Sequence, residues 1–166
     1  GDTIRFTIDF ENSGSRTARD LIITDYIDYS GNIHNTRYIS GSLISTVPGI
    51  FEYLDGESGS WGEVPPPPER VKGIRLLVDQ IPPGLEGNIS FMVEVDQQHL
   101  STPVFNSSFA DYTGGDSRPY QTFSNEISVL VGSYSQVHIG PRGRPEAEDG
   151  SVGDMVVHTL NMQVTK

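Results

Sequence analysis

Carboxylates near strand ends are the side chains in this sequence that are best suited to bind a ligand. Asp25 and Asp28 follow a predicted strand, and Asp111 lies near Asp116 beside a Gly-Gly turn. Hard oxygen ligands carried on loops are the ligands that Ca²⁺ prefers. These four aspartates are therefore candidate calcium ligands, although solvated loop carboxylates would give the same pattern.

The sequence lacks the motifs of common catalytic centres. It has no Gly-rich phosphate loop, no G-x-S-x-G nucleophile elbow and no H-E-x-x-H zinc motif. Its histidines, at positions 34, 99, 138 and 158, do not have metal-ligand spacing, and it contains no cysteine. No two carboxylates stand out as a glycosidase pair. We therefore expect no catalytic residues and no cofactor other than the calcium considered above.

Two sequons are candidate glycosylation sites. Asn88-Ile89-Ser90 places Asn88 on the polar face of a predicted strand, where a glycan has room. Asn106-Ser107-Ser108 places Asn106 on the same face as Ala110, so this side chain is expected to face inward.

Charge and composition exclude several classes of protein. The 166 residues carry a formal net charge of -11, which repels nucleic-acid phosphates and favours solubility. No stretch is long and apolar enough to cross a membrane. Without cysteine the chain cannot use disulfides, but an extracellular location remains compatible with that composition. We expect no nucleic-acid partner and no membrane-spanning segment.

Hydrophobic residues alternate with polar ones along several segments, which is typical of half-buried strands. In the first segment the inward face consists of Ile4, Phe6, Ile8 and Phe10. Further strands are expected near 20–26, 37–40, 50–54, 74–78, 89–95, 104–112 and 120–131. Spacings near ten residues, with turns between them, predict an all-β, Ig-like antiparallel β-sandwich over residues 1–131.

Two segments interrupt this pattern. Residues 56–62 form a predicted loop that contains Trp61, either as a lid on one end of the sandwich or as a ligand platform, and 65–68 is a polyproline spacer. Residues 132–150 are rich in Gly, Pro and charge, and are predicted to be a linker.

The tail, residues 151–166, repeats the pattern of the opening strand. Gly153-Asp154 and Thr159 match Gly1-Asp2 and Thr7. The residues that fall on the inward positions, and that we name as candidate strand-exchange residues, are Val156, His158, Leu160, Met162 and Val164. Burying four such apolar side chains would contribute on the order of 6–10 kcal/mol before ordering costs.

A strand without a domain behind it needs a partner, and three arrangements fit the tail. It could be the start of a truncated tandem repeat, it could fold back on its own domain, or it could complete a neighbouring subunit by strand addition. After Met162 the match to the opening segment ends, since 163–166 lack the turn found at 11–14. That departure favours a tail specialised as a donated strand.

Several short motifs follow one another in a characteristic order over residues 1–131. They are Gly1-Asp2-Thr3-Ile4, Asn12-Ser13-Gly14-Ser15, Asp20 to Asp25, Tyr38 to Ser42, Ile81-Pro82-Pro83-Gly84 with Ile89-Ser90-Phe91, Asn106 to Tyr112, and Ser124 to Val129. In this order they resemble the DUF11 conserved repeat, and the tail is similar to the start of a next copy. The resemblance implies an Ig-like sandwich, repeated in tandem on prokaryotic surface proteins, with no common catalytic residues.

From these observations we expect an extracellular or cell-surface structural protein rather than an enzyme. The leading hypothesis is a subunit or repeat of a filament or surface array that assembles head to tail by strand addition, with identical subunits or neighbouring repeats as partners. The alternative is an adhesin or carbohydrate-binding stalk module that binds a glycan near Trp61, Tyr53 and Tyr112.

Overall fold

The described part of the chain contains thirteen strands and one short 3₁₀ turn, Pro68–Arg70, joined by loops and turns. The structure is a computed structural model that describes residues 3–27, 36–95, 103–130 and 155–165. The strands are β1 (Thr3–Asn12), β2 (Ala18–Asp25), β3 (Thr36–Tyr38), β4 (Ile44–Ser45), β5 (Ile50–Asp55), β6 (Trp61–Gly62), β7 (Val71–Ile81), β8 (Glu86–Val95), β9 (Pro103–Asn106), β10 (Ser108–Thr113), β11 (Pro119–Phe123), β12 (Ile127–Leu130) and β13 (Met155–Thr165).

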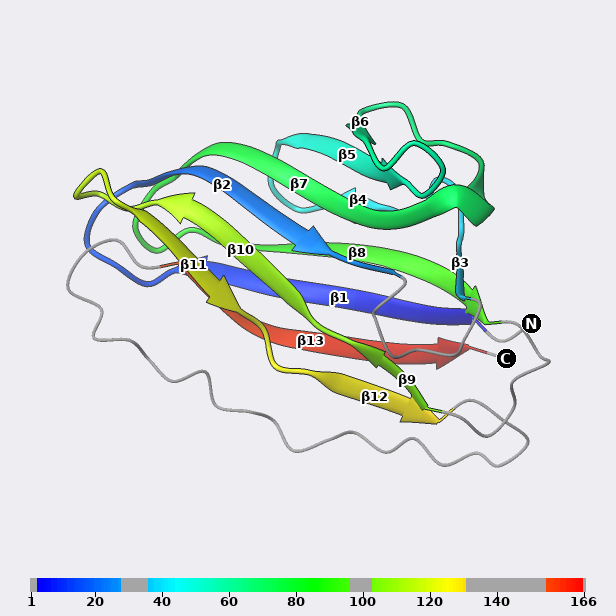
Figure 1. The fold of residues 1–166 in the computed structure, drawn as a ribbon. Helices are drawn as coiled ribbons and strands as arrows, with labels where there is room; N and C mark the ends of the chain where they lie inside the picture. Colours follow the sequence, from blue (N-terminus) through cyan, green and yellow to red (C-terminus); the bar gives the residue numbers. More distant parts are fainter. Residues whose placement is uncertain (1–2, 28–35, 96–102, 131–154, 166) are drawn as a thin grey trace.

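The strands form two main sheets, and every observed pairing is antiparallel (Figure 1). The first sheet has the order β13-β1-β8-β3, with β4 also paired to β8. The second has the order β11-β10-β2-β7-β5-β6, and β9 pairs with β12 in a separate ribbon. This arrangement confirms the expected all-β sandwich. Within the described residues, no helix has the length and apolar character needed to cross a membrane.

The core lies between the two sheets and follows the alternation in the sequence. All four inward residues of β1 are buried, as are Ile89, Phe91, Val93 and Val95 of β8, which lies beside it. The second sheet supplies Leu21, Ile23, Ile74 and Leu76 from β2 and β7. Period-2 burial of apolar side chains on both facing sheets explains why these segments are strands.

Two predicted strands are broken in the structure. The expected strand 104–112 divides into β9 and β10 at Ser107, and 120–131 divides into β11 and β12. The backbone N–H of Ser108 donates to Ser124 Oγ instead of to a neighbouring strand. The two strands beyond the break, β9 and β12, therefore leave the second sheet and pair with each other as the β9–β12 ribbon. Trp61 also differs from expectation, because it belongs to the edge strand β6 and not to a loop or an end lid.

Asn12, at the end of β1, joins the β1–β2 turn to the end of β7. Its buried Nδ2 donates to the carbonyls of Arg16 and Ile81 at 2.8 and 2.7 Å, and its Oδ1 accepts from Gly14 N–H at 3.1 Å. A buried amide with three such bonds fixes the path of the backbone through the turn.

We expect Asn12→Ala to lower the free energy of unfolding by about 2 kcal/mol, because it leaves buried backbone groups without partners. Urea denaturation measures this change. Gln121→Ala, which removes a single exposed bond to Asp111, is the control and should change stability by less than about 0.5 kcal/mol. Equal stability of the two variants would contradict the role assigned to Asn12.

Candidate functional site

The candidate site is the edge of β1 that faces away from β8, which we call the acceptor edge. On one side β1 pairs with β8 from Thr3 to Glu11, and on the other it pairs with β13. Because β13 is the last strand of the first sheet, β1 would become an edge strand without it. An uncovered edge presents unpaired N–H and C=O groups and is a template for strand addition.

The register of β13 on β1 places apolar residues opposite apolar residues along most of its length. The apolar pairs are Ile4 with Val164, Phe6 with Met162, Ile8 with Leu160, and Phe10 with Val157, whereas Val156 lies opposite Glu11. A register shift lies between Asp9 and Phe10, and there His158 has no Cα partner. The uninterrupted alternation expected through Val156 and His158 is therefore replaced by an irregularity, after which Val157 and not His158 is the Cα partner of Phe10.

β13 also closes one side of the sandwich. It lies between β1 and the β10–β11 hairpin, which it contacts (Figure 1). The neighbouring β9–β12 ribbon contributes the buried residues Val104, Ile127 and Val129 to the core. Without β13, the acceptor edge would be the open side of the core. A strand placed there extends the hydrogen bonding of the first sheet and covers that side of the core.

Asp25 does not lie on a calcium-binding loop. Its side chain is buried, and Asn106 Nδ2 donates to its Oδ2 at 3.0 Å. Burial raises the pKa of Asp25 to about 7, and the hydrogen bond from Asn106 opposes that rise only in part. Asp25 is therefore a buried strand residue bonded to Asn106 and not a solvated loop carboxylate, and calcium binding by Asp25 with Asp28 stays a prediction.

Asp111 and Asp116 are engaged in hydrogen bonds of the β10–β11 hairpin. Asp111 accepts from Gln121 Nε2, and Asp116 accepts from Tyr120 Oη and from Arg118 N–H. Within the residues that the structure describes, no group of three acidic or histidine side chains could hold a metal ion. Asp28 lies outside the described residues. Asp111 and Asp116 are therefore explained by hydrogen bonds within the β10–β11 hairpin.

The two sequons differ in accessibility. Asn106 is 3 % exposed and its amide nitrogen is occupied by Asp25, so the folded chain does not offer it for glycosylation. This corrects its place among the candidate glycosylation sites. Asn88 is partly exposed and lines an open hollow with Asp9 and Glu86, so glycosylation of Asn88 stays a prediction.

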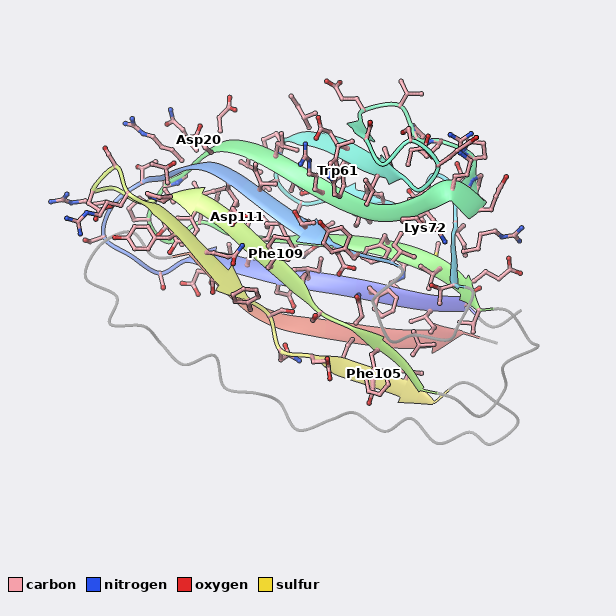
Figure 2. All side chains as sticks on the ribbon, in the orientation of Figure 1. Asp20, Trp61, Lys72, Phe105, Phe109 and Asp111 are labelled. Atoms are coloured by element: carbon pink, nitrogen blue, oxygen red, sulfur yellow. The ribbon has the colours of Figure 1, made fainter. Side chains whose placement is uncertain are left out.

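The aromatic residues named for glycan binding do not share one surface. Tyr112 is 6 % exposed and stacks on Tyr120, while Tyr53 packs against Tyr38. Trp61 instead begins a different group, the aromatic row, on the outer face of the second sheet. Figure 2 shows Trp61 and Phe109 on this sheet. Successive ring centroids in the row are 6.1–6.2 Å apart, in the order Trp61, Tyr26, Phe109 and Phe123.

Sequence reasoning missed this aromatic row because its members come from four segments. Arg75 lies over the Trp61 ring at 4.5 Å from the centroid, and Gly73 leaves space beneath Trp61 and Tyr26. Tyr26 and Phe123 are 39 % and 65 % exposed. The sequence shows aromatics in these segments, Trp61 within a predicted loop and the others in predicted strands, but not that they adjoin.

Comparison with known proteins gives a likeness in fold. No family model and no curated protein matches the chain. Among solved structures it resembles the major pilin subunit of Bacillus cereus, with a TM-score of 0.55 and 9 % sequence identity. The match covers 98 % of this chain and 50 % of that one, so the chain spans half the length of the solved pilin. At this identity the likeness establishes a shared β-sandwich architecture.

Proposed function

We propose that the chain is a structural subunit or repeat of an extracellular filament or surface array, assembled head to tail by β-strand addition. In this assembly β13 of one copy occupies the acceptor edge of the next. The observation that carries the proposal is the pairing of β13 along the whole of β1, from Thr3 opposite Thr165 to Asn12 opposite Met155, with one register shift.

This pairing is compatible with exchange between copies. β13 follows β12 only after residues 131–154, and its backbone can make the same bonds to β1 of another identical copy. A donated strand that adds to a sheet edge gains main-chain hydrogen bonds and fills a hydrophobic side of the acceptor. The likeness in fold to a pilin and the DUF11 resemblance support the same proposal, with no enzymatic role.

A disulfide across the β1–β13 pair tests which copy supplies the strand. Thr7 and Asn161 are direct Cα partners, and antiparallel partners lie about 4.5–5.5 Å apart, within disulfide reach. The chain contains no cysteine, so Thr7→Cys/Asn161→Cys introduces the only thiols. After assembly and oxidation, we expect a ladder of covalent multimers on a non-reducing gel.

The single variants Thr7→Cys and Asn161→Cys are the controls, because each alone can form no product larger than a dimer. If the double variant instead gives only a monomer with an internal disulfide, β13 belongs to its own chain and strand exchange is wrong.

The second candidate function is a glycan-binding stalk module, and the aromatic row favours it. Partly exposed Trp, Tyr and Phe rings beside Arg75 are the composition of a recognition surface. An internal disulfide in the experiment above, together with binding of a soluble oligosaccharide that Phe109→Ala abolishes, would favour this function over the filament.

A further inference from the structure

Two arginines line an open cleft where the β1–β2 turn meets the β10–β11 turn. The cleft has a volume of about 490 Å³, and Arg16 and Arg19 are its cationic residues. Both are exposed, and neither makes an ion pair within the described part of the chain. Four other arginines there are paired: Arg37 with Glu94, Arg70 with Asp55 and Glu57, Arg75 with Glu52, and Arg118 with Asp116. Two adjacent unpaired arginines are notable on a chain with a net charge of -11.

The local backbone holds the cleft open. A Cβ at Gly115 would lie 2.4 Å from Arg16 Cβ, so glycine at this position lets the arginine lie across the turn. Asp20, labelled in Figure 2 at this end of the molecule, is the one carboxylate among the lining residues. The cleft therefore keeps a net positive charge and is complementary to an acidic ligand.

The same turn marks the start of β13. Asn12 Nδ2 donates to the Arg16 carbonyl at 2.8 Å, and Asn12 is the Cα partner of Met155, the first residue of β13. Wherever β13 comes from, the chain that leads into it must pass this end of β1. The residues just before β13 include the acidic segment 146–149, Glu-Ala-Glu-Asp, followed by Asp154. Met155 lies six positions after Asp149, so the segment can reach points within about 20 Å of Asn12.

We propose that the Arg16–Arg19 cleft binds the acidic segment 146–149 that leads into the donated strand. The partner, a neighbouring copy of the chain, rests on the function proposed above. Charge complementarity identifies this occupant, because the segment is acidic, the cleft is cationic and the strand register brings them to one end of β1.

Such a contact would set the register and the rate of strand addition. A slip of one residue between β13 and β1 turns every side chain to the opposite face. An ionic contact at the first residue of the strand excludes slipped registers and accelerates encounter between two chains that otherwise repel each other. Exposed ionic contacts weaken as salt rises, so the effect should be largest at low ionic strength.

Charge reversal in the full chain tests the contact. The readouts are the rate of seeded filament growth at low and high salt, and the melting temperature of the unassembled chain. We expect Arg16→Glu/Arg19→Glu to slow growth about tenfold at low salt, and Glu146→Lys/Glu148→Lys/Asp149→Lys to do the same. Combining both sets should restore growth to within about threefold of the parent. Two double variants that each remove two positive charges control for net charge. Arg16→Gln/Arg19→Gln removes them from the cleft, and Arg37→Gln/Arg70→Gln removes them elsewhere.

The outcomes separate this inference from the proposed function. If the parent grows filaments but the reversals have no effect, or the combination fails to recover, the cleft does not bind the segment although strand addition stands. If the parent forms no filaments, the proposed function fails. In that case the melting temperatures decide whether the cleft and the segment are in contact within one chain. A melting temperature that recovers in the combined variant supports this contact, and losses that add in the combined variant overturn it.

Discussion

A chain that ends at Gly150 is expected to form no filaments and to melt at least about 10 °C below the full chain. Removing residues 151–166 deletes β13, which leaves β1 from Thr3 to Asn12 as an unpaired edge and opens the core beside the β10–β11 hairpin. A loss of several kcal/mol corresponds to roughly this shift in a domain of this size. Electron microscopy measures the assembly, and thermal unfolding followed by circular dichroism measures the stability.

A synthetic peptide of residues 155–166 provides the matched test. Added to the shortened chain, it should raise the melting temperature in proportion to the logarithm of its concentration, as expected for a ligand that binds only the folded state. A scrambled peptide of the same composition should not. Filaments that persist in the shortened chain, or an unchanged melting temperature, would show that the acceptor edge is not where copies join.

The regular parts of this fold could be predicted because their alternation is strict. β1 and β5 fall where they were expected, β8 begins three residues before its expected range of 89–95, and the four inward residues named for β1 are buried. The break at Ser107 was not predicted, and burial keeps its period of two from Val104 to Tyr112 across it. It depends on a contact between Ser108 and Ser124, two segments that only the folded hairpin brings together.

The candidate site was predicted only in part, for a physical reason. The sequence identified the tail as a strand with an apolar face, but hydrogen bonds to β1 are the same whether β13 comes from its own chain or another. The irregularity at His158 depends on pairing with β1 and leaves no local signature. The burial of Asp25 and its bond to Asn106 could not be predicted, because Asn106 is distant from it in the sequence.

Unfolding free energy is expected to fall as the pH rises from about 4 to about 7, and Asp25 is the cause. Its pKa is about 7 in the folded chain, against an ordinary value of 3.8, because burial disfavours the charged carboxylate. A raised acid pKa means that the folded state binds the proton more tightly. This stabilisation is complete below about pH 4 and is lost as the pH passes through 7, with a total change of up to ~4 kcal/mol.

The surroundings of Asp25 explain why the neutral form is preferred. Oδ1 has no hydrogen-bond partner, and neither does Oγ of Ser108, the residue opposite on β10. Ionisation would leave a buried charge with only the bond from Asn106, whereas the protonated carboxyl carries no charge to desolvate. The carboxylates with lowered pKa values, Asp55 at about 2 among them, lose their contribution only below about pH 4 and so do not overlap this window.

Asp25→Asn should therefore remove the slope between about pH 4 and pH 7 and leave a chain that is more stable than the parent above pH 7, by roughly 2–4 kcal/mol. Guanidinium denaturation at several pH values measures both effects. Asp111→Asn is the matched control, since Asp111 is a partly exposed aspartate of the neighbouring strand and its loss should leave the slope in place.

If Asp25→Asn keeps the parent slope, another buried group must titrate in this range. If it loses stability at every pH, the bond between Asn106 and Asp25 Oδ2 outweighs the cost of the buried charge, and the pair holds the β9–β10 break to the end of β2 as an ionic contact.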